Sequence, residues 1–133
     1  LLALADILIL NETELASFAG LDAEPADPEA AVAAARSLAR SGQTVLATLG
    51  AAGAVAVRGD EVARVGGLRQ RAVDTTGAGD CFCGALAAGL DRGLALPAAM
   101  AFANAAAALS VTRAGAAASM PTAVEVEALL ASA

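Results

Sequence analysis

The sequence predicts an α/β protein, and two observations carry that prediction. Short, continuous apolar runs that suit buried strands alternate along the chain with stretches of helical composition. The apolar runs at residues 5–10 and 44–50 each end in a polar or glycine-containing turn. In sheets of this class, strand ends and helix starts gather at one edge, where ligands bind. We therefore expect the functional residues at that edge.

The expected strands differ in their surroundings. Residues 5–10 form a short apolar run that ends at Asn11, which is typical of a strand buried on both faces of a parallel sheet. Residues 44–50 form a second such strand. Residues 54–65 predict an antiparallel hairpin, because polar residues at 58–61 interrupt an otherwise apolar stretch.

Helices are expected where capping residues frame apolar stretches. Asp27 as N-cap and Pro28 in the first helical position begin one helix, and Gly42 is its expected stop. Thr122, with Glu125 three residues later, forms a capping-box start for the last helix. The helices are expected over residues 12–20, 27–42, 81–90, 96–111 and 122–132.

The charge balance and the missing residue types exclude several classes of protein. The 133-residue chain has a formal net charge of -6, whereas nucleic acid is bound through clustered Lys and Arg. The chain contains no Lys, His, Trp or Tyr. This excludes a P-loop lysine, a Ser-His-Asp triad, a His-ligated zinc site and an aromatic platform for bases. Acid–base chemistry is left to Asp, Glu and Cys.

Membrane insertion and metal binding by cysteine are both disfavoured. Residues 93–112 carry no charge, but this stretch contains Pro97 and Asn104, and nine of its twenty residues are alanine, a weakly apolar residue. It therefore predicts a buried core helix rather than a membrane span. Cys81 and Cys83 are too close in sequence to close a loop, and they lack partners for a metal. We expect two small, buried side chains in a reducing cytoplasm.

The stretch DTTGAGD at residues 74–80 predicts a helix start that binds anions. Gly77, Ala78 and Gly79 are small enough to let a negatively charged ligand approach the main chain closely. The helix that begins near Asp80 points its free N–H groups and the positive end of its dipole at the same place. That field favours the ionised form of Asp80, which can then act as a base beside a site that stabilises anions.

Each part of this stretch also has a purely structural interpretation. Aspartate is a preferred N-cap, so Asp80 alone is more often a cap than a base, and glycines before a helix more often serve a turn. A dinucleotide-binding fingerprint does not fit, because Phe82 stands where the third glycine is required. The functional interpretation therefore depends on the other motifs of the chain.

Four motifs occur together in one order and span nearly the whole chain. They are NETE at residues 11–14, TLGAAG at 48–53, DTTGAGD at 74–80 and SVTRAGAAASMP at 110–121. This set resembles the C-terminal half of the ribokinase-like (phosphofructokinase-B type) carbohydrate kinases, with the GAGD block as its most specific part. The resemblance implies a three-layer αβα sheet with helices on both faces. It also implies that residues 1–133 are the nucleotide-binding and catalytic portion, without the N-terminal sugar-binding half and lid.

The resemblance implies transfer of the γ-phosphoryl group of ATP to a hydroxymethyl group of a sugar. Asp80 is implied as the base that takes the hydroxymethyl proton, with residues 77–79 as the anion hole over the transferring group. Asn11 and Glu14 are implied to help place Mg²⁺ and the phosphates, partly through water. The residues implied to contact the nucleotide, the last of them beside the adenine, are Thr48, Leu49, Gly50, Ala51, Ala52, Gly53, Gly79, Asp80 and Asn104.

Several members of the family need a monovalent cation, and the resemblance extends to those positions. Potassium is therefore expected, held mostly by main-chain carbonyl oxygens, with Asp74 as the main formal charge. Oxygen-rich coordination suits a hard cation. An Asx-type turn that begins at Asp74 is the structural alternative. The implied cation positions are Asp74, Thr76, Ser110, Arg113, Gly115 and Ser119.

The substrate and the activity of the isolated chain are left with alternatives. The first and last motifs most resemble the family members that act on ribose, whereas TTGAGD is shared by fructokinase, adenosine kinase and others. A noncatalytic nucleotide-binding module, or an inactive truncated product, is the competing hypothesis, and a plain Ala-rich structural domain is a third. We expect a sugar and ATP as partners, with neither nucleic acid nor membrane. A homodimer of the full-length protein would depend on the lid of the missing half.

Overall fold

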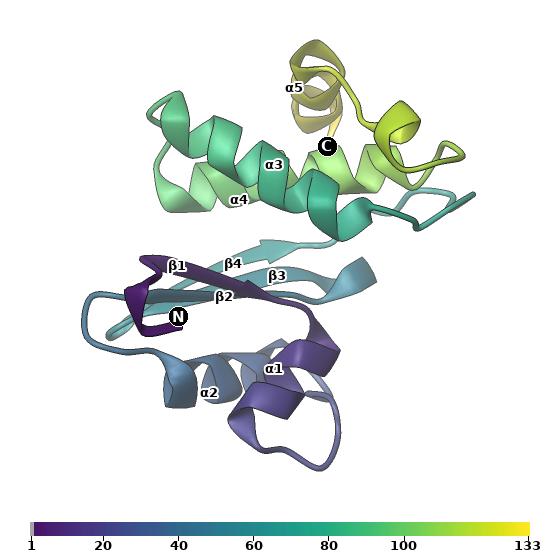
Figure 1. The fold of residues 1–133 in the computed structure, drawn as a ribbon. Coiled ribbons are helices and arrows are strands. Elements are labelled where there is room, and N and C mark those ends of the chain that lie inside the picture. Colours follow the sequence, from purple (N-terminus) through teal and green to yellow (C-terminus); the bar gives the residue numbers. More distant parts are fainter. Residues whose placement is uncertain (1) are drawn as a thin grey trace. The chain divides into compact units, whose positions relative to one another are not determined.

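The computed structural model describes residues 2–133, which divide after Gly66 into two compact units. The first unit holds the sheet and two α-helices, and the second holds three α-helices joined by loops (Figure 1). Each unit has a hydrophobic core cluster of its own. The alternation of strands and helices that the sequence predicts is confirmed in the first unit.

The sheet of the first unit has four strands in the order β1-β2-β3-β4. They are β1 Ile7–Leu10, β2 Thr44–Thr48, β3 Gly53–Arg58 and β4 Glu61–Gly66. Strands β1 and β2 are parallel, with Leu10 opposite Ala47, so both strands end at the same edge of the sheet. Strands β3 and β4 form the predicted antiparallel hairpin, in which Arg58 faces Glu61. The strand predictions are therefore confirmed.

The burial predicted for the first strand was wrong over most of its length. Ile7, Leu8 and Ile9 are only partly buried, and Leu10 alone in β1 is fully buried. The physical reason is the position of β1 at the edge of the four-stranded sheet. The second strand, β2, lies between two neighbours and is buried from Thr44 to Ala47, as its apolar run predicts.

Helices α1 Glu12–Ala19 and α2 Pro28–Leu38 lie on one face of this sheet (Figure 1). Burying each Leu or Val beneath them contributes about 1.5–3 kcal/mol, which holds the helices on the strands. Gly20 ends α1 in the left-handed conformation, with φ of 67°, as the sequence predicts. The core of this unit includes Leu10, Leu15, Ala31, Ala35, Val45, Val55 and Val57.

The start of α2 is confirmed, but its predicted end was wrong. Asp27 is the N-cap, and its Oδ1 accepts a hydrogen bond of 2.8 Å from the amide of Ala30. The helix ends at Leu38 rather than near Gly42, because the next residue already has an extended backbone. A turn closed by the Gln43 amide and the Arg40 carbonyl then leads into β2.

The second unit contains α3 Ala78–Asp91, α4 Leu96–Ser110 and α5 Ala123–Ser132. Helices α3 and α4 lie side by side (Figure 1), and they approach closely at Gly89, where an added Cβ would lie 3.2 Å from the Cβ of Ala99. The prediction that both cysteines are buried was wrong: Cys81 is buried and Cys83 is exposed. Residues two positions apart on a helix point to different faces, which accounts for the difference.

Three short 3₁₀ helices complete the secondary structure of residues 2–133: η1 Leu2–Leu4, η2 Gly50–Ala52 and η3 Ala117–Ser119. The predicted capping box at the start of α5 is confirmed, since Thr122 and Glu125 exchange side-chain and main-chain hydrogen bonds. None of the helices in the described part of the chain is long and apolar enough to cross a membrane.

Candidate active site

The predicted nucleotide turn lies directly after β2 in the first unit. Gly50 has φ of 50° and Gly53 has φ of 99°, conformations that favour glycine. The turn is closed at both ends, because the Leu49 amide donates to the Gly53 carbonyl and the Ala52 amide to the Leu49 carbonyl, each at 2.8 Å. Since β1 and β2 are parallel, Asn11 and this turn lie at the same sheet edge, as predicted.

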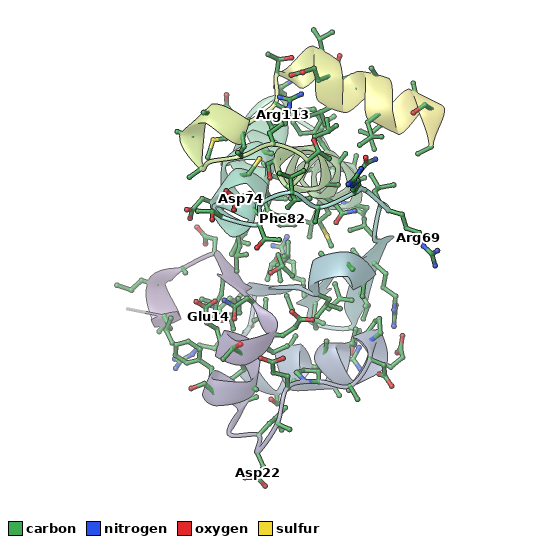
Figure 2. All side chains as sticks on the ribbon, turned by 90° about the vertical axis from the view of Figure 1, so that its right-hand side faces the viewer. Glu14, Asp22, Arg69, Asp74, Phe82 and Arg113 are labelled. Atoms are coloured by element: carbon green, nitrogen blue, oxygen red, sulfur yellow. The ribbon has the colours of Figure 1, made fainter. Side chains whose placement is uncertain are left out.

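The NETE motif forms a capping box at the start of α1. The Asn11 Oδ1 accepts a hydrogen bond of 2.8 Å from the Glu14 amide, and the Glu14 Oε2 accepts one of 2.9 Å from the Asn11 amide. Asn11 is exposed, and Glu14 lies at the start of α1 in Figure 2. Within residues 2–133 the second oxygen of Glu14, Oε1, accepts no hydrogen bond. The box thus fixes both side chains and leaves one carboxylate oxygen for a ligand.

Glu12 is a residue of this edge that sequence reasoning missed. A Cβ added to Gly50 would lie 4.0 Å from its Oε2, so its carboxylate borders the nucleotide turn. Partial burial, and then the charge of Glu24, raise the pKa of Glu12. Its place beside a turn that follows another strand could not be read from the sequence, because it depends on the pairing of β1 with β2.

The start of α3 in the second unit has the geometry of an anion-binding site. Gly77 is the N-cap, with φ of 77°, and α3 begins at Ala78, two residues before the predicted start near Asp80. The Ala78 amide donates to the Thr75 carbonyl at 3.2 Å. Within residues 2–133 the next two amides, those of Gly79 and Asp80, donate no hydrogen bond. These two donors are available to a ligand.

Asp80 is not the N-cap of α3, so that structural interpretation of the residue was wrong. It is the third residue of the helix and is exposed. Its carboxylate has no hydrogen-bond or ion-pair partner among the described residues. An unpaired carboxylate beside two unpaired amides is an arrangement that can accept a proton next to a bound anion.

The loop after α4 packs directly against this helix start. A Cβ added to Gly77 would lie 3.2 Å from the Cβ and 3.3 Å from the Cα of Ala116. Glycine is therefore required at position 77 both for its backbone conformation and for this contact. We call residues 110–119, from the end of α4 through η3, the 110–119 loop; its residue Ala116 borders the start of α3.

Asp74 links the segment before α3 to the same loop. Its Oδ1 accepts a hydrogen bond from the Thr76 amide and its Oδ2 accepts one from the Gly115 amide, both at 2.9 Å. The bond from Thr76 closes the Asx-type turn that was expected as the structural alternative to a cation-binding role of Asp74. The bond from Gly115 joins residues 41 positions apart. The Thr76 hydroxyl and the amides of Gly115 and Thr76 lower the pKa of Asp74 to about 2.

Most side chains at the predicted cation positions are engaged with other protein groups. The hydroxyls of Ser110 and Ser119 are buried and donate to main-chain carbonyls at 2.8 and 2.7 Å. The guanidinium of Arg113 pairs with Glu125 at 2.5 Å. The main-chain carbonyl groups at these positions differ from the side chains. Within residues 2–133, no hydrogen bond is accepted by the carbonyl oxygens of Asp74, Thr76, Arg113 and Gly115.

These oxygens fit a hard monovalent cation by the chemistry of the donor set. Carbonyl oxygens and an ionised carboxylate are its preferred ligands. The described residues contain no group of three or more His, Cys, Asp or Glu side chains that could hold a metal. A cation at the loop would therefore depend on main-chain oxygens, with Asp74 supplying the charge.

Comparison with known proteins identifies the family. The sequence profile described as "pfkB family carbohydrate kinase" matches residues 1–123. The chain belongs to the pfkB family of carbohydrate kinases. A ribokinase of Haemophilus influenzae is 42% identical over 123 residues, which cover 92% of this chain and 40% of that protein. The chain thus spans less than half the length of this pfkB relative.

Solved structures show the fold of the pfkB chain. The ribokinase of Arabidopsis thaliana, solved with ribose and ATP, aligns with a TM-score of 0.85 and 35% identity over 97% of this chain and 42% of that one. A structure from Escherichia coli that contains ATP and Mg²⁺ aligns with a TM-score of 0.82 and 31% identity, over 99% of this chain and 41% of that one. The predicted ribokinase-like α/β fold is confirmed.

The remaining predicted nucleotide residue lies inside α4. Asn104 is 9% exposed and sits among the buried residues of that helix. Its position beside an adenine stays a prediction, as do the roles of the 48–53 turn and of the cation loop.

Proposed function

We propose that the chain is the C-terminal, nucleotide-binding and catalytic portion of an ATP-dependent sugar kinase that phosphorylates a hydroxymethyl group of ribose. The observation that carries the proposal is the start of α3, where two unpaired amides lie beside the unpaired carboxylate of Asp80. The names of the relatives support ribose as the substrate, since one is solved with ribose and ATP.

Asp80 accepts the proton of the attacking hydroxyl group. The amides of Gly79 and Asp80 donate hydrogen bonds to the oxygens of the phosphoryl group as it is transferred, and the dipole of α3 adds to their effect. Phosphoryl transfer requires positioning and electrostatic stabilisation more than covalent chemistry from the protein. Main-chain donors are therefore sufficient in a chain without lysine.

Three parts of the chain supply the nucleotide and magnesium contacts in this proposal. The turn 48–53 lines the nucleotide, and Asn104 lies beside the adenine. Asn11 and Glu14, fixed in their capping box, would help to place Mg²⁺ and the phosphates, partly through water, with Glu14 Oε1 as the oxygen that the box leaves open. When bound, Mg²⁺ neutralises phosphate charge.

Potassium is part of the proposal as an activating ion held by the 110–119 loop and the carbonyls around Asp74. The free carbonyl oxygens and the lowered pKa of Asp74, about 2, support this assignment, because the carboxylate stays ionised at any physiological pH. We also assign the enzyme to the cytoplasm, where the thiols of Cys81 and Cys83 remain reduced.

The isolated chain has a second candidate function as a noncatalytic nucleotide-binding module. The observation that favours it is length, since the chain covers only 40% of the ribokinase it matches. Isothermal titration with ATP and magnesium distinguishes the two functions when it is combined with an activity assay. Binding without turnover by the isolated chain, and turnover by the full-length protein, would assign the module function to the chain alone.

The decisive experiment is a coupled kinase assay of the full-length protein with ATP and Mg²⁺ across a panel of sugars and nucleosides. We expect ribose to give the highest kcat/KM, and potassium to raise activity relative to a choline control. Preference for fructose or a nucleoside would replace ribose by that substrate. Failure to phosphorylate any of them would overturn the kinase proposal.

A further inference from the structure

Arg113 and Glu125 form an ion pair between the 110–119 loop and the start of α5. The guanidinium lies 2.5 Å from Glu125 Oε1, and the two side chains are 38% and 42% exposed. Figure 2 shows Arg113 beside the start of α5. Glu125 is itself held firmly, because its Oε2 accepts hydrogen bonds from the amide and the hydroxyl of Thr122 at 2.7 and 2.9 Å. Arg113 thus pairs with a carboxylate whose position is fixed by Thr122.

The residues that follow Arg113 contact both sides of the entrance to α3. Two positions later, the Gly115 amide donates to Asp74 at 2.9 Å. At the next position, Ala116 packs on Gly77, the residue that precedes α3. The turn 113–116 is therefore fixed to α5 at one end and meets the helix start at the other. All of these contacts lie within the second unit.

We propose that Arg113 and Glu125 are positioning residues, whose ion pair holds the turn 113–116 against Asp74 and Gly77 and so fixes the anion-binding start of α3. This inference rests on the proposed kinase function. In this role each side chain acts through Gly115 and Ala116 and takes no direct part in the reaction.

The physical argument separates this role from a general contribution to stability. An exposed ion pair contributes little to the stability of the folded state, because water and salt screen it. Loss of the pair is therefore expected to loosen one turn rather than to unfold the protein. By contrast, a small displacement of the α3 amides relative to the phosphoryl group reduces the rate strongly, because their effect depends on preorganised geometry.

The test uses Glu125→Gln in the full-length protein. Glutamine can take the place of glutamate in a capping box, so the start of α5 is kept while the charge on the partner of Arg113 is removed. The matched control is Glu127→Gln, which removes a similar ion pair from the same helix, the one with Arg92 at 2.9 Å. Arg92 also lies 5.5 Å from the centroid of the Phe102 ring in α4, so the printed partners of this pair belong to α4 and α5.

Three experiments are run: amide hydrogen exchange at Gly115 and Thr76, steady-state kinetics for kcat and for KM of ATP, and thermal unfolding for the melting temperature. In Glu125→Gln we expect exchange at Gly115 to become about fivefold faster, as for the loss of one local contact. We expect kcat to fall about tenfold, with KM for ATP within about twofold of wild type, because geometry rather than binding is lost. The control should change none of these quantities.

A double variant completes the test. Because the two residues act as one unit, Arg113→Gln together with Glu125→Gln should be no more impaired than either single variant. Equal behaviour of Glu125→Gln and Glu127→Gln in exchange and in kcat would overturn the proposal, as would fully additive effects in the double variant. If the wild-type protein lacks kinase activity, the proposed function fails, and the exchange rates still decide whether the pair fixes the turn.

Discussion

At the residue scale, the candidate site depends on which polar groups have partners and which do not. Asp74 and Glu14 each use one or both carboxylate oxygens within the protein, so they are fixed in place. Asp80 has no such partner among the described residues and is exposed. These carboxylates therefore have different roles. A hydrogen-bonded carboxylate keeps the neighbouring main chain in place, whereas an unpaired carboxylate can accept a proton.

Replacing Asp80 by asparagine tests the proposed base directly. A carboxamide cannot accept the hydroxyl proton, so we expect kcat of the intact enzyme to fall about 10²–10⁴-fold in Asp80→Asn. The affinity for ATP should stay near the wild-type value, because the substitution leaves the main-chain amide at this position in place. Steady-state kinetics and titration with ATP measure the two quantities. Nearly unchanged turnover would remove Asp80 from the role of base.

Acid titration tests the hydrogen bonds of Asp74. Its pKa is lowered from 3.8 to about 2 in the folded protein, so the carboxylate contributes stability at pH values above 3.8. This contribution is lost as the pH falls towards 2, because the protonated form cannot accept both amide bonds. The unfolding midpoint of the wild type should drop over that window, and Asp74→Asn should show a smaller drop. Denaturant unfolding at several pH values provides the measurement, and parallel curves would contradict the assignment.

At the element scale, helix starts do most of the positioning. The helix starts with side chains or glycine in defined roles are the capping box of α1, the Asp27 N-cap of α2, the Gly77 entrance of α3 and the capping box of α5. In α1 the same two residues serve the helix and the predicted magnesium contact. Structural and functional effects of a substitution there can therefore be separated by choosing the replacement.

Glu14→Gln separates the two roles at α1. Glutamine retains the capping box, so the melting temperature should change little. The loss of charge should raise the Mg²⁺ concentration for half-maximal activity about tenfold, as is typical when an outer contact to a metal is removed. Asn11→Ala is the matched structural variant and should cost about 1 kcal/mol of unfolding free energy through loss of the cap. An unchanged magnesium requirement in Glu14→Gln would contradict the proposed role.

Two glycines of the same region give a further matched pair. Gly77→Ala places a Cβ at 3.2 Å from Ala116 with φ of 77°, so we expect it to destabilise the protein by about 1–3 kcal/mol. Gly84→Ala in the exposed middle of α3 meets nothing within 4 Å and should stabilise it by about 0.5–1 kcal/mol. Urea unfolding of both variants checks the opposite signs. Equal effects would show that the Ala116 contact is not tight.

At the scale of the whole molecule, local signals predicted more than long-range ones. The element order, the N-cap at Asp27 and the capping box at Thr122 follow from residues close to each other in sequence, and all three are confirmed. The capping box at Asn11 carried the same kind of local signal and was missed. The bond from Gly115 to Asp74 spans 41 positions, so no local pattern could reveal it.

The main-chain donors at the entrance to α3 have one last consequence. Amide hydrogens neither titrate near neutrality nor react with acylating agents, and the chain has no lysine for such agents to modify. Lysine acetylation, which can silence a phosphate-binding protein by removing a charge, therefore has no target in these 133 residues.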